Sequence, residues 1–254
     1  MIYILFFTIT LLILLLVLYQ LQYFMVFTPL YHRKEILDDS YEYLSITTDD
    51  GIELEGIVYN HPEPRTTILF FGGRSHDSVG LIRRLKECYT DARIITFNYR
   101  SYGRSKGVVN EKNILADGLK IAQIVHKNYG DFYLLGFSLG SYVSAFIASH
   151  MNVLGVFMVG SFDSVSRVIK TRYGVNLSWF LRYKLDVTKY ISKVDAPTYL
   201  FVSKDDETIP LKNGRNLKIF VKNLEFYKEY DGLSHKELLW DKETISQINR
   251  KRND

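Results

Sequence analysis

The distribution of apolar residues divides the chain into an N-terminal segment and a longer patterned region. Residues 1–31 contain no Lys, Arg, Asp, Glu or His, and residues 11–18 are entirely aliphatic. About 20 apolar residues are enough for a helix that crosses a bilayer. The pattern therefore predicts a transmembrane anchor over residues 1–30, with Tyr19, Tyr23 and Tyr31 near the membrane interface.

A cleaved signal peptide is the competing interpretation of this segment. Such peptides begin with a positive region and end at a cleavage site of small residues. No Lys or Arg precedes the apolar run and no Ala or Gly occurs before Gly51, so we expect an uncleaved single-pass anchor. Arg33 and Lys34 follow it, and by the positive-inside rule they favour a cytoplasmic location for the rest of the chain.

After a linker over residues 31–40, the pattern changes to short strands and helices. Residues 43–47 and 52–59 predict two strands joined by a hairpin turn at Asp49-Asp50-Gly51. Apolar runs at 67–71, 94–97, 132–135 and 153–159 are typical of strands buried on both faces. Further strands are expected at 197–202 and 224–230, with a C-terminal helix from about residue 235. A hairpin followed by alternating strands and helices predicts one α/β domain over residues 41–254, with a mainly parallel central sheet and helices on both faces.

One insertion in this order is longer than a plain connection. Residues 162–195 are rich in aromatic side chains, including Tyr173, Trp179, Phe180 and Tyr183. Long insertions between regular elements commonly carry function. We interpret the segment as a small helical cap over a site; the alternative is an ordinary surface pair of helices.

Composition narrows the class of protein. A chain of 254 residues, 47% of them hydrophobic and 24% charged, can bury a core of its own. The net charge of +4 is mild, and without a basic stripe it gives no case for nucleic acid. Cys88 is the single cysteine, so an internal disulfide is excluded, and no Cys/His spacing indicates a metal site.

The strongest chemical signal is Gly136-Phe137-Ser138-Leu139-Gly140, a G-x-S-x-G. It lies between a predicted buried strand and a predicted helix. That context is typical of the sharp turn that presents the nucleophile of a serine hydrolase. Glycines on either side allow the turn, because a Cβ atom there would collide with the neighbouring backbone.

Two further segments resemble the α/β-hydrolase superfamily, and within it the membrane-anchored, ABHD-type group. Residues 98–107, Asn-Tyr-Arg-Ser-Tyr-Gly-Arg-Ser-Lys-Gly, are similar to the family's D-Y-R-G-Y-G-x-S-x-G loop. Residues 203–210, Ser-Lys-Asp-Asp-Glu-Thr-Ile-Pro, are similar to its G-x-x-D-x-x-V-P. The likeness covers about residues 41–240 and implies the α/β-hydrolase fold.

The resemblance implies a catalytic triad of Ser138, Asp206 and His235, in the chain order of this superfamily. A histidine is a base near neutral pH and can take the serine proton, while a carboxylate fixes its tautomer. The spacing to Pro210 favours Asp206 over Asp205. His76 is the remaining histidine of interest, and we expect it to have a surface loop role.

The oxyanion hole is expected to consist of two backbone N–H groups, from Leu139 and from Gly73. In this loop Phe71 replaces a histidine of the family motif, and Ser101 and Ser203 replace family glycines. That histidine has a structural role in the relatives, so we expect the hole to be retained.

The sequence therefore predicts a membrane-anchored serine hydrolase of the carboxylesterase or thioesterase kind, which needs no metal or organic cofactor. The expected substrate is a small-molecule or lipid acyl compound, cleaved at a carboxylic ester, lipid ester or thioester. Three alternatives stay open: a serine peptidase, a catalytically weak or inactive membrane binding module, and a non-hydrolytic enzyme such as a haloperoxidase or lyase.

Overall fold

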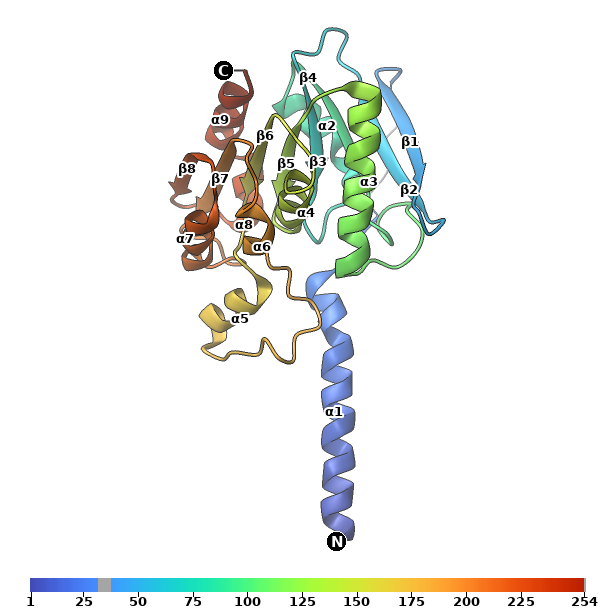
Figure 1. Cartoon of the computed structure of the whole chain (residues 1–254), viewed down its shortest axis with the longest axis vertical. Helices are drawn as coiled ribbons and strands as arrows, with labels where there is room; N and C mark the ends of the chain where they lie inside the picture. Colours follow the sequence, from blue (N-terminus) through green and yellow to red (C-terminus); the bar gives the residue numbers. More distant parts are fainter. Residues whose placement is uncertain (32–37, 254) are drawn as a thin grey trace.

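An eight-stranded sheet lies at the centre of the computed structural model, which describes residues 1–31 and 38–253 (Figure 1). The strands run in the order β1-β2-β4-β3-β5-β6-β7-β8. The two pairings β1–β2 and β2–β4 are antiparallel and the others are parallel. Their bounds are β1 (Tyr41–Thr47), β2 (Glu53–Tyr59), β3 (Thr66–Phe71), β4 (Ala92–Phe97), β5 (Tyr133–Phe137), β6 (Gly155–Val159), β7 (Thr198–Ser203) and β8 (Leu224–Tyr230).

The predicted mainly parallel α/β sheet is therefore confirmed, and the ends of each strand agree with the prediction to within two residues. Arg33 and Lys34, which carry the predicted orientation, and most of the linker lie outside the described residues.

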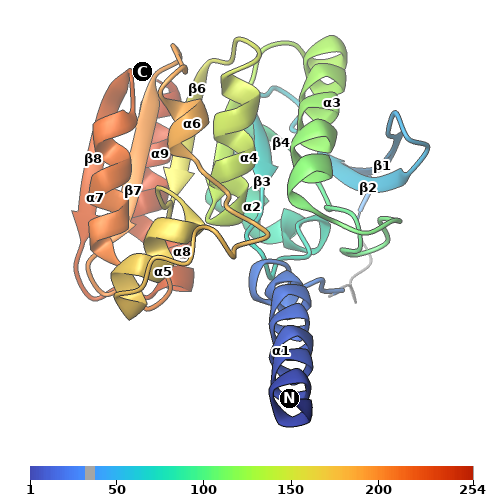
Figure 2. The same ribbon diagram turned by 60° about the horizontal axis from the view of Figure 1, so that its bottom comes forward.

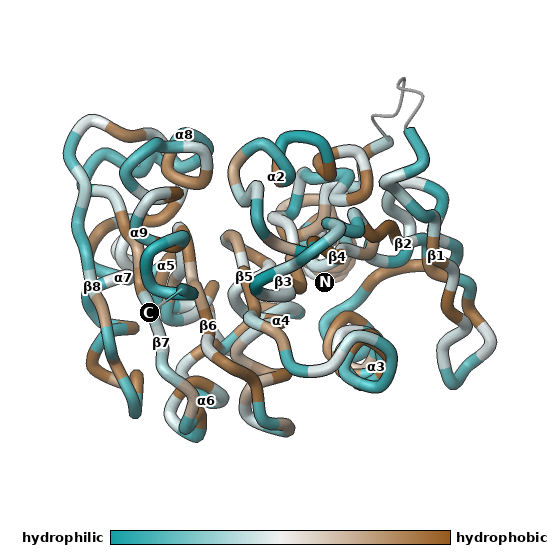
Figure 3. The backbone as a smooth tube through the Cα atoms, turned by 90° about the horizontal axis from the view of Figure 1, so that it is seen from above, coloured by the Kyte–Doolittle hydropathy of each residue, from teal (hydrophilic) through white to brown (hydrophobic). Residues whose placement is uncertain are grey.

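Helices cover both faces of the sheet, as Figures 2 and 3 show. One layer is formed by α3 (Glu111–Tyr129), α4 (Leu139–Ala148), α6 (Thr188–Ile191) and α7 (Leu211–Phe220), and the other by α2 (Ile82–Cys88), α8 (His235–Trp240) and α9 (Lys242–Asn253). A short 3-10 helix, η1 (Val79–Leu81), leads into α2.

The central strands are apolar on both faces because each face is covered. Leu69 and Phe71 of β3 belong to the core under α3 and α4, while Ile68 and Phe70 belong to the core under α2 and α8. This alternation follows from the two-residue repeat of a strand. It accounts for the continuous apolar runs of the sequence.

The N-terminal segment forms α1 (Ile2–Val26), which projects from the domain in Figure 1. Of the described helices it is the one long and apolar enough to cross a membrane. The C-terminal end of α1 packs against the domain. Gln22 is 7% exposed, and the buried ring of Phe27 packs on Tyr183 with ring centroids 5.1 Å apart.

The cap insertion is only partly helical. It contains α5 (Val165–Tyr173) and the one-turn α6, while residues 174–187 between them form turns and irregular backbone, called here the cap loop. Gly174 stops α5 by adopting a left-handed conformation with φ +73°. Within the loop Leu185 also has a positive φ, of +39°. The cap loop and α5 lie on the side of the domain from which α1 emerges (Figures 1 and 2).

Candidate active site

Ser138 lies at the turn between β5 and α4, where the sequence predicted the nucleophile. Its φ is +52°, a value that residues other than glycine rarely adopt. Its backbone N–H donates to Val159 O over 2.9 Å, which fixes the turn against β6. The residue is 8% exposed. A residue held in such a conformation by its surroundings is common at active sites.

The two glycines of the motif are required by packing. A Cβ atom at Gly140 would lie 1.9 Å from Phe71 O, and one at Gly136 would lie 2.7 Å from the backbone of Ser141. These contacts are with backbone, so no side-chain adjustment relieves them. The tight turn brings the start of α4 against the end of β3, next to the predicted oxyanion loop.

Asp206 and His235 meet at the carboxyl ends of the strands. Asp206 follows β7, and His235 is the first residue of α8. His235 Nδ1 and Asp206 Oδ2 are 2.6 Å apart, and both side chains are nearly inaccessible, at 8% and 2% exposed. The other carboxylate oxygen of Asp206 accepts the backbone N–H groups of Thr208 and Ile209 over 2.8 and 2.7 Å. The carboxylate is thus held rigidly toward the imidazole.

Two other carboxylates near these strand ends are engaged elsewhere. Asp205 accepts the backbone N–H of Gly232 over 2.6 Å. The buried Asp163 accepts the side-chain amides of Asn213 and Asn216 over 2.8 and 2.6 Å. Asp206 is therefore the aspartate that contacts His235, as the motif spacing indicated.

His235 lies beside the residue that precedes Ser138. The rings of Phe137 and His235 are 4.9 Å apart between centroids. Gly160 leaves room for the imidazole, because a Cβ atom there would approach His235 Cε1 to 3.0 Å. The backbone N–H of His235 donates to Glu207 Oε2 over 2.9 Å, and this bond lowers the pKa of Glu207. Sequence reasoning missed Glu207, since nothing in the motif distinguishes it from a solvated loop charge.

His76 is half-buried in the loop after β3, where the sequence predicted a surface loop role. Its ring stacks on Phe137, with centroids 5.1 Å apart and an interplanar angle of 9°. Burial, followed by the nearby charge of His235, lowers the pKa of His76 to about 4. Phe137 is remote from His76 in sequence, so this ring contact could not be predicted.

The predicted oxyanion donors border Ser138. Leu139 N–H is the first of α4, and helix geometry gives such a group no acceptor within its own helix. A Cβ atom at Gly73 would lie 3.6 Å from Ser138 Cβ, so Gly73 is beside the nucleophile. Its N–H, however, donates to His76 Nδ1 over 3.2 Å. His76 is thus the acceptor for this donor in the resting structure.

A pocket of about 200 Å³ opens beside Ser138 and Leu139. Much of its wall comes from three places: Gln22, Met25 and Val26 of α1; Val165, Val168 and Ile169 of α5; and Leu181, Tyr183 and Leu185 of the cap loop. Phe162, Tyr173, Thr208, Ile209 and the two arginines Arg74 and Arg172 complete the lining, so a mostly apolar cavity has cationic groups in its wall. The cap and the N-terminal helix therefore both help to form the cavity next to the serine.

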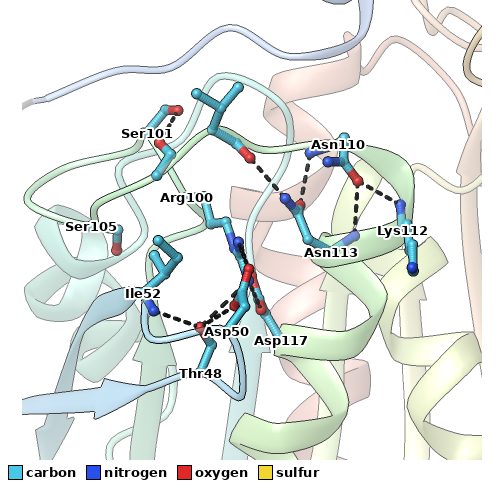
Figure 4. Close-up of polar contacts among 12 residues, drawn as sticks. Thr48, Asp50, Ile52, Arg100, Ser101, Ser105, Asn110, Lys112, Asn113 and Asp117 are labelled. Atoms are coloured by element: carbon cyan, nitrogen blue, oxygen red, sulfur yellow. Dashed lines mark hydrogen bonds and ion pairs between the residues drawn. The ribbon is translucent and has the colours of Figure 1, made fainter.

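The other family-like loop, residues 98–107, connects the β1–β2 hairpin and α3 through Arg100 (Figure 4), and its Tyr99 and Tyr102 hydroxyls donate to Gly72 O and Arg74 O at the rim of the site. Arg100 pairs with the buried Asp117 and with Asp50, with nearest N–O distances of 2.7 Å in each case. Arg100 also lowers the pKa of Asp50. Ser101, where the family motif has glycine, adopts φ +68° and donates its hydroxyl to Gly107 O over 2.8 Å. The serine thus keeps the glycine-like conformation, and the loop joins the β1–β2 hairpin to α3.

Comparison with known sequences gives distant relatives. No protein-family model matches the chain. An uncharacterised protein of Acanthamoeba polyphaga mimivirus is 26% identical over 211 residues, which cover 73% of this chain and 71% of that protein. Lysophosphatidylserine lipase ABHD12 of Danio rerio is 22% identical over 147 residues, 49% of this chain and 38% of that protein.

Solved structures give a clearer likeness. An esterase of Pyrococcus furiosus matches with a TM-score of 0.70 over 89% of this chain and 96% of that one, at 15% identity. Esterases of a Rhodococcus species and of Exiguobacterium antarcticum match with TM-scores of 0.65 and 0.63, over 84% and 83% of this chain and 98% and 99% of theirs, at 15% and 14% identity. With its sheet order, the chain has the α/β-hydrolase fold that these solved structures share.

Proposed function

We propose that the chain is a serine hydrolase that cleaves ester-type bonds through Ser138, His235 and Asp206. The observation that carries the proposal is the hydrogen bond between the buried Asp206 and His235, beside a serine on a strained strand-to-helix turn. A histidine oriented by a carboxylate is the group that makes a serine hydroxyl nucleophilic.

In this mechanism Ser138 Oγ attacks the ester carbonyl while His235 Nε2 takes its proton. Asp206 keeps the other ring nitrogen protonated and stabilises the imidazolium that forms. The proton then passes to the departing alkoxide or thiolate, which leaves an acyl-enzyme. Water attacks that intermediate with His235 again as base, and the acid is released.

The negative oxygen of each tetrahedral intermediate needs donors. Leu139 N–H and Gly73 N–H border Ser138 and are proposed to supply them. For Gly73 this requires its N–H to turn from His76 Nδ1 toward the substrate oxygen, or to be shared between the two acceptors. In the resting protein His76 Nδ1 then accepts the hydrogen bond that the oxyanion would accept during the reaction.

The substrate class follows from the pocket. Apolar walls from α1, α5 and the cap loop suit an acyl chain better than a polar peptide. The distant relative that is a lysophosphatidylserine lipase supports a lipid ester as the first class to test. A panel of single-chain and double-chain lipid esters, with a thioester of matched chain length, separates these possibilities.

We also propose that α1 remains on the protein as a membrane anchor. Its last turns are part of the pocket, and Gln22 is buried against the cap. Removal of the segment as a signal peptide would expose that surface. N-terminal sequencing of the protein from membranes, together with extraction by alkaline carbonate, tests retention and insertion; a mature chain that begins after residue 26 would contradict the anchor.

Labelling with a fluorophosphonate probe is the test of the hydrolase proposal. The wild-type protein is expected to label at Ser138, and Ser138→Ala to show none while retaining its fold by circular dichroism. Ser141→Ala is a matched control in the same turn and is expected to label. Absence of labelling in folded wild-type protein would contradict the proposal and favour a binding module on the same fold.

A further inference from the structure

The sequence of α1 sets the level of a membrane interface on the protein. Residues 1–18 are apolar apart from Thr8 and Thr10, whose hydroxyls bond to carbonyls of the preceding turn. At a rise of about 1.5 Å per residue these 18 residues span about 27 Å, close to the thickness of the bilayer hydrocarbon. The next five residues, 19–23, are Tyr-Gln-Leu-Gln-Tyr. If α1 crosses the bilayer, this stretch lies in the interface.

The cap loop contacts α1 at that level. Gln22 donates its side-chain amide to Phe180 O over 3.2 Å and accepts Arg182 N–H over 2.8 Å. Two residues earlier in α1, Gln20 accepts a hydrogen bond from the Arg182 guanidinium over 2.8 Å, and the rings of Tyr19 and Phe180 are 6.1 Å apart between centroids. Backbone and side-chain contacts together fix the height of the loop on the helix.

The free side of this region carries side chains suited to a membrane surface. Trp179 is 77% exposed, and Tyr173 and Val175 are also exposed. Residues 170–184 contain four basic residues and no acidic one. Tryptophan and tyrosine are enriched at the level of lipid head groups, and basic side chains are attracted to anionic lipids there.

We propose that the cap loop, with Trp179 at its exposed end, is a second membrane-contact element that lies in the bilayer interface beside α1. The proposal rests on α1 being the membrane anchor. It commits to a lipid surface as the partner because the exposed aromatic and basic side chains are continuous with the helix at the level where its apolar run ends. Met25 and Val26, which line the pocket, lie about two helical turns beyond that level. The pocket therefore opens next to the head groups, where a lipid ester resides.

The experiment uses the fluorescence of Trp179. The chain has two tryptophans, and Trp240→Phe leaves Trp179 alone while keeping a ring beneath the guanidinium of Arg84. The full-length variant is reconstituted into phosphatidylcholine vesicles, with and without lipids brominated near the top of the acyl chain. We expect Trp179 to emit at shorter wavelength in the vesicles than in the denatured chain. We also expect quenching by the brominated lipid and only weak quenching by aqueous iodide.

Trp179→Phe is the matched control, since it leaves only Trp240, and it is expected to show no extra quenching by brominated lipid. Strong iodide quenching of Trp179 without bromolipid quenching would overturn the proposal. Protection from both quenchers would also overturn it, because it would mean that another protein surface covers the loop. Failure of α1 to insert, scored by carbonate extraction, overturns it as well. Fluorophosphonate labelling in the same vesicles reports the hydrolase independently, so the two proposals fail separately.

Discussion

His76 provides a test of how tightly the stack around Phe137 is packed. An ordinary histidine titrates near pH 6.5, and in the folded chain the pKa of His76 is lowered to about 4. Its Nδ1 accepts the N–H of Gly73, which only the unprotonated ring can do. Acidification is therefore expected to destabilise the loop that borders Ser138 as well as the fold.

The sign and size of the pH effect on the free energy of unfolding follow from linkage between protonation and folding. Between the two pKa values the unfolded chain binds a proton that the folded chain does not, so the contribution is present above pH 6.5 and is lost as pH falls toward 4. At about pH 5 the loss from this one group is about 2 kcal/mol of the free energy of unfolding. At about pH 7.5 the loss of unfolding free energy from His76 is close to zero.

The assay compares wild type with His76→Phe, which keeps a ring stacked on Phe137 but cannot titrate. Urea unfolding of the detergent-solubilised full chain is measured at about pH 7.5 and about pH 5. The variant lacks the acceptor for Gly73 N–H at both pH values, so that loss cancels when its two unfolding free energies are compared. The remaining difference between wild type and variant is due to protonation of His76. Wild type is expected to lose about 2 kcal/mol more than the variant on acidification. Equal losses, or a ring titration near pH 6.5 by NMR, would refute the reasoning.

Two substitution pairs test the rest of the site. Asp206→Asn is expected to lower kcat for ester hydrolysis by roughly 10³- to 10⁴-fold because His235 loses the acceptor that sets its tautomer, whereas Asp205→Asn should stay near the wild-type rate; similar losses would contradict the assignment. Gln22→Ala removes two hydrogen bonds of about 1 kcal/mol each, so hydrogen exchange at the Arg182 amide should be roughly 30-fold faster. Gln20→Ala, which affects only the Arg182 side chain, should leave that exchange unchanged. Equal protection of the Arg182 amide in both variants would contradict the role of Gln22 in holding the cap loop on α1.

Much of the fold could be predicted because its signals are local. The strands of the centre are covered on both faces, so each appears as a short apolar run, and the glycines around Ser138 are required by contacts within one turn and with β3. Asp206 was distinguished from Asp205 by spacing alone, and the structure gives the reason: Asp205 turns to Gly232.

What escaped prediction depends on segments that meet only in three dimensions. The ring contacts of Phe137 with His76 and His235 join the loop after β3, the end of β5 and the start of α8, and no one segment of the sequence shows them. The expected cap helices are interrupted because Gly174 ends α5 and the cap loop is instead held by side chains of α1. Gln20 and Gln22, two polar residues after the apolar run, were the local signs of that contact.

The hydrogen bond between Gln22 and Phe180 O joins two residues that are 158 positions apart in the sequence. During synthesis the helix is made first, and its share of the pocket stays incomplete until the cap loop and most of the sheet have followed. Ser138, Asp206 and His235 belong to the part of the chain that carries the sheet, whereas Met25 and Val26 of the pocket wall belong to α1. A cut between α1 and β1 would therefore place the two sets of residues on different fragments. For the proposed hydrolase, such a cut is expected to change the range of esters accepted more than the reaction itself.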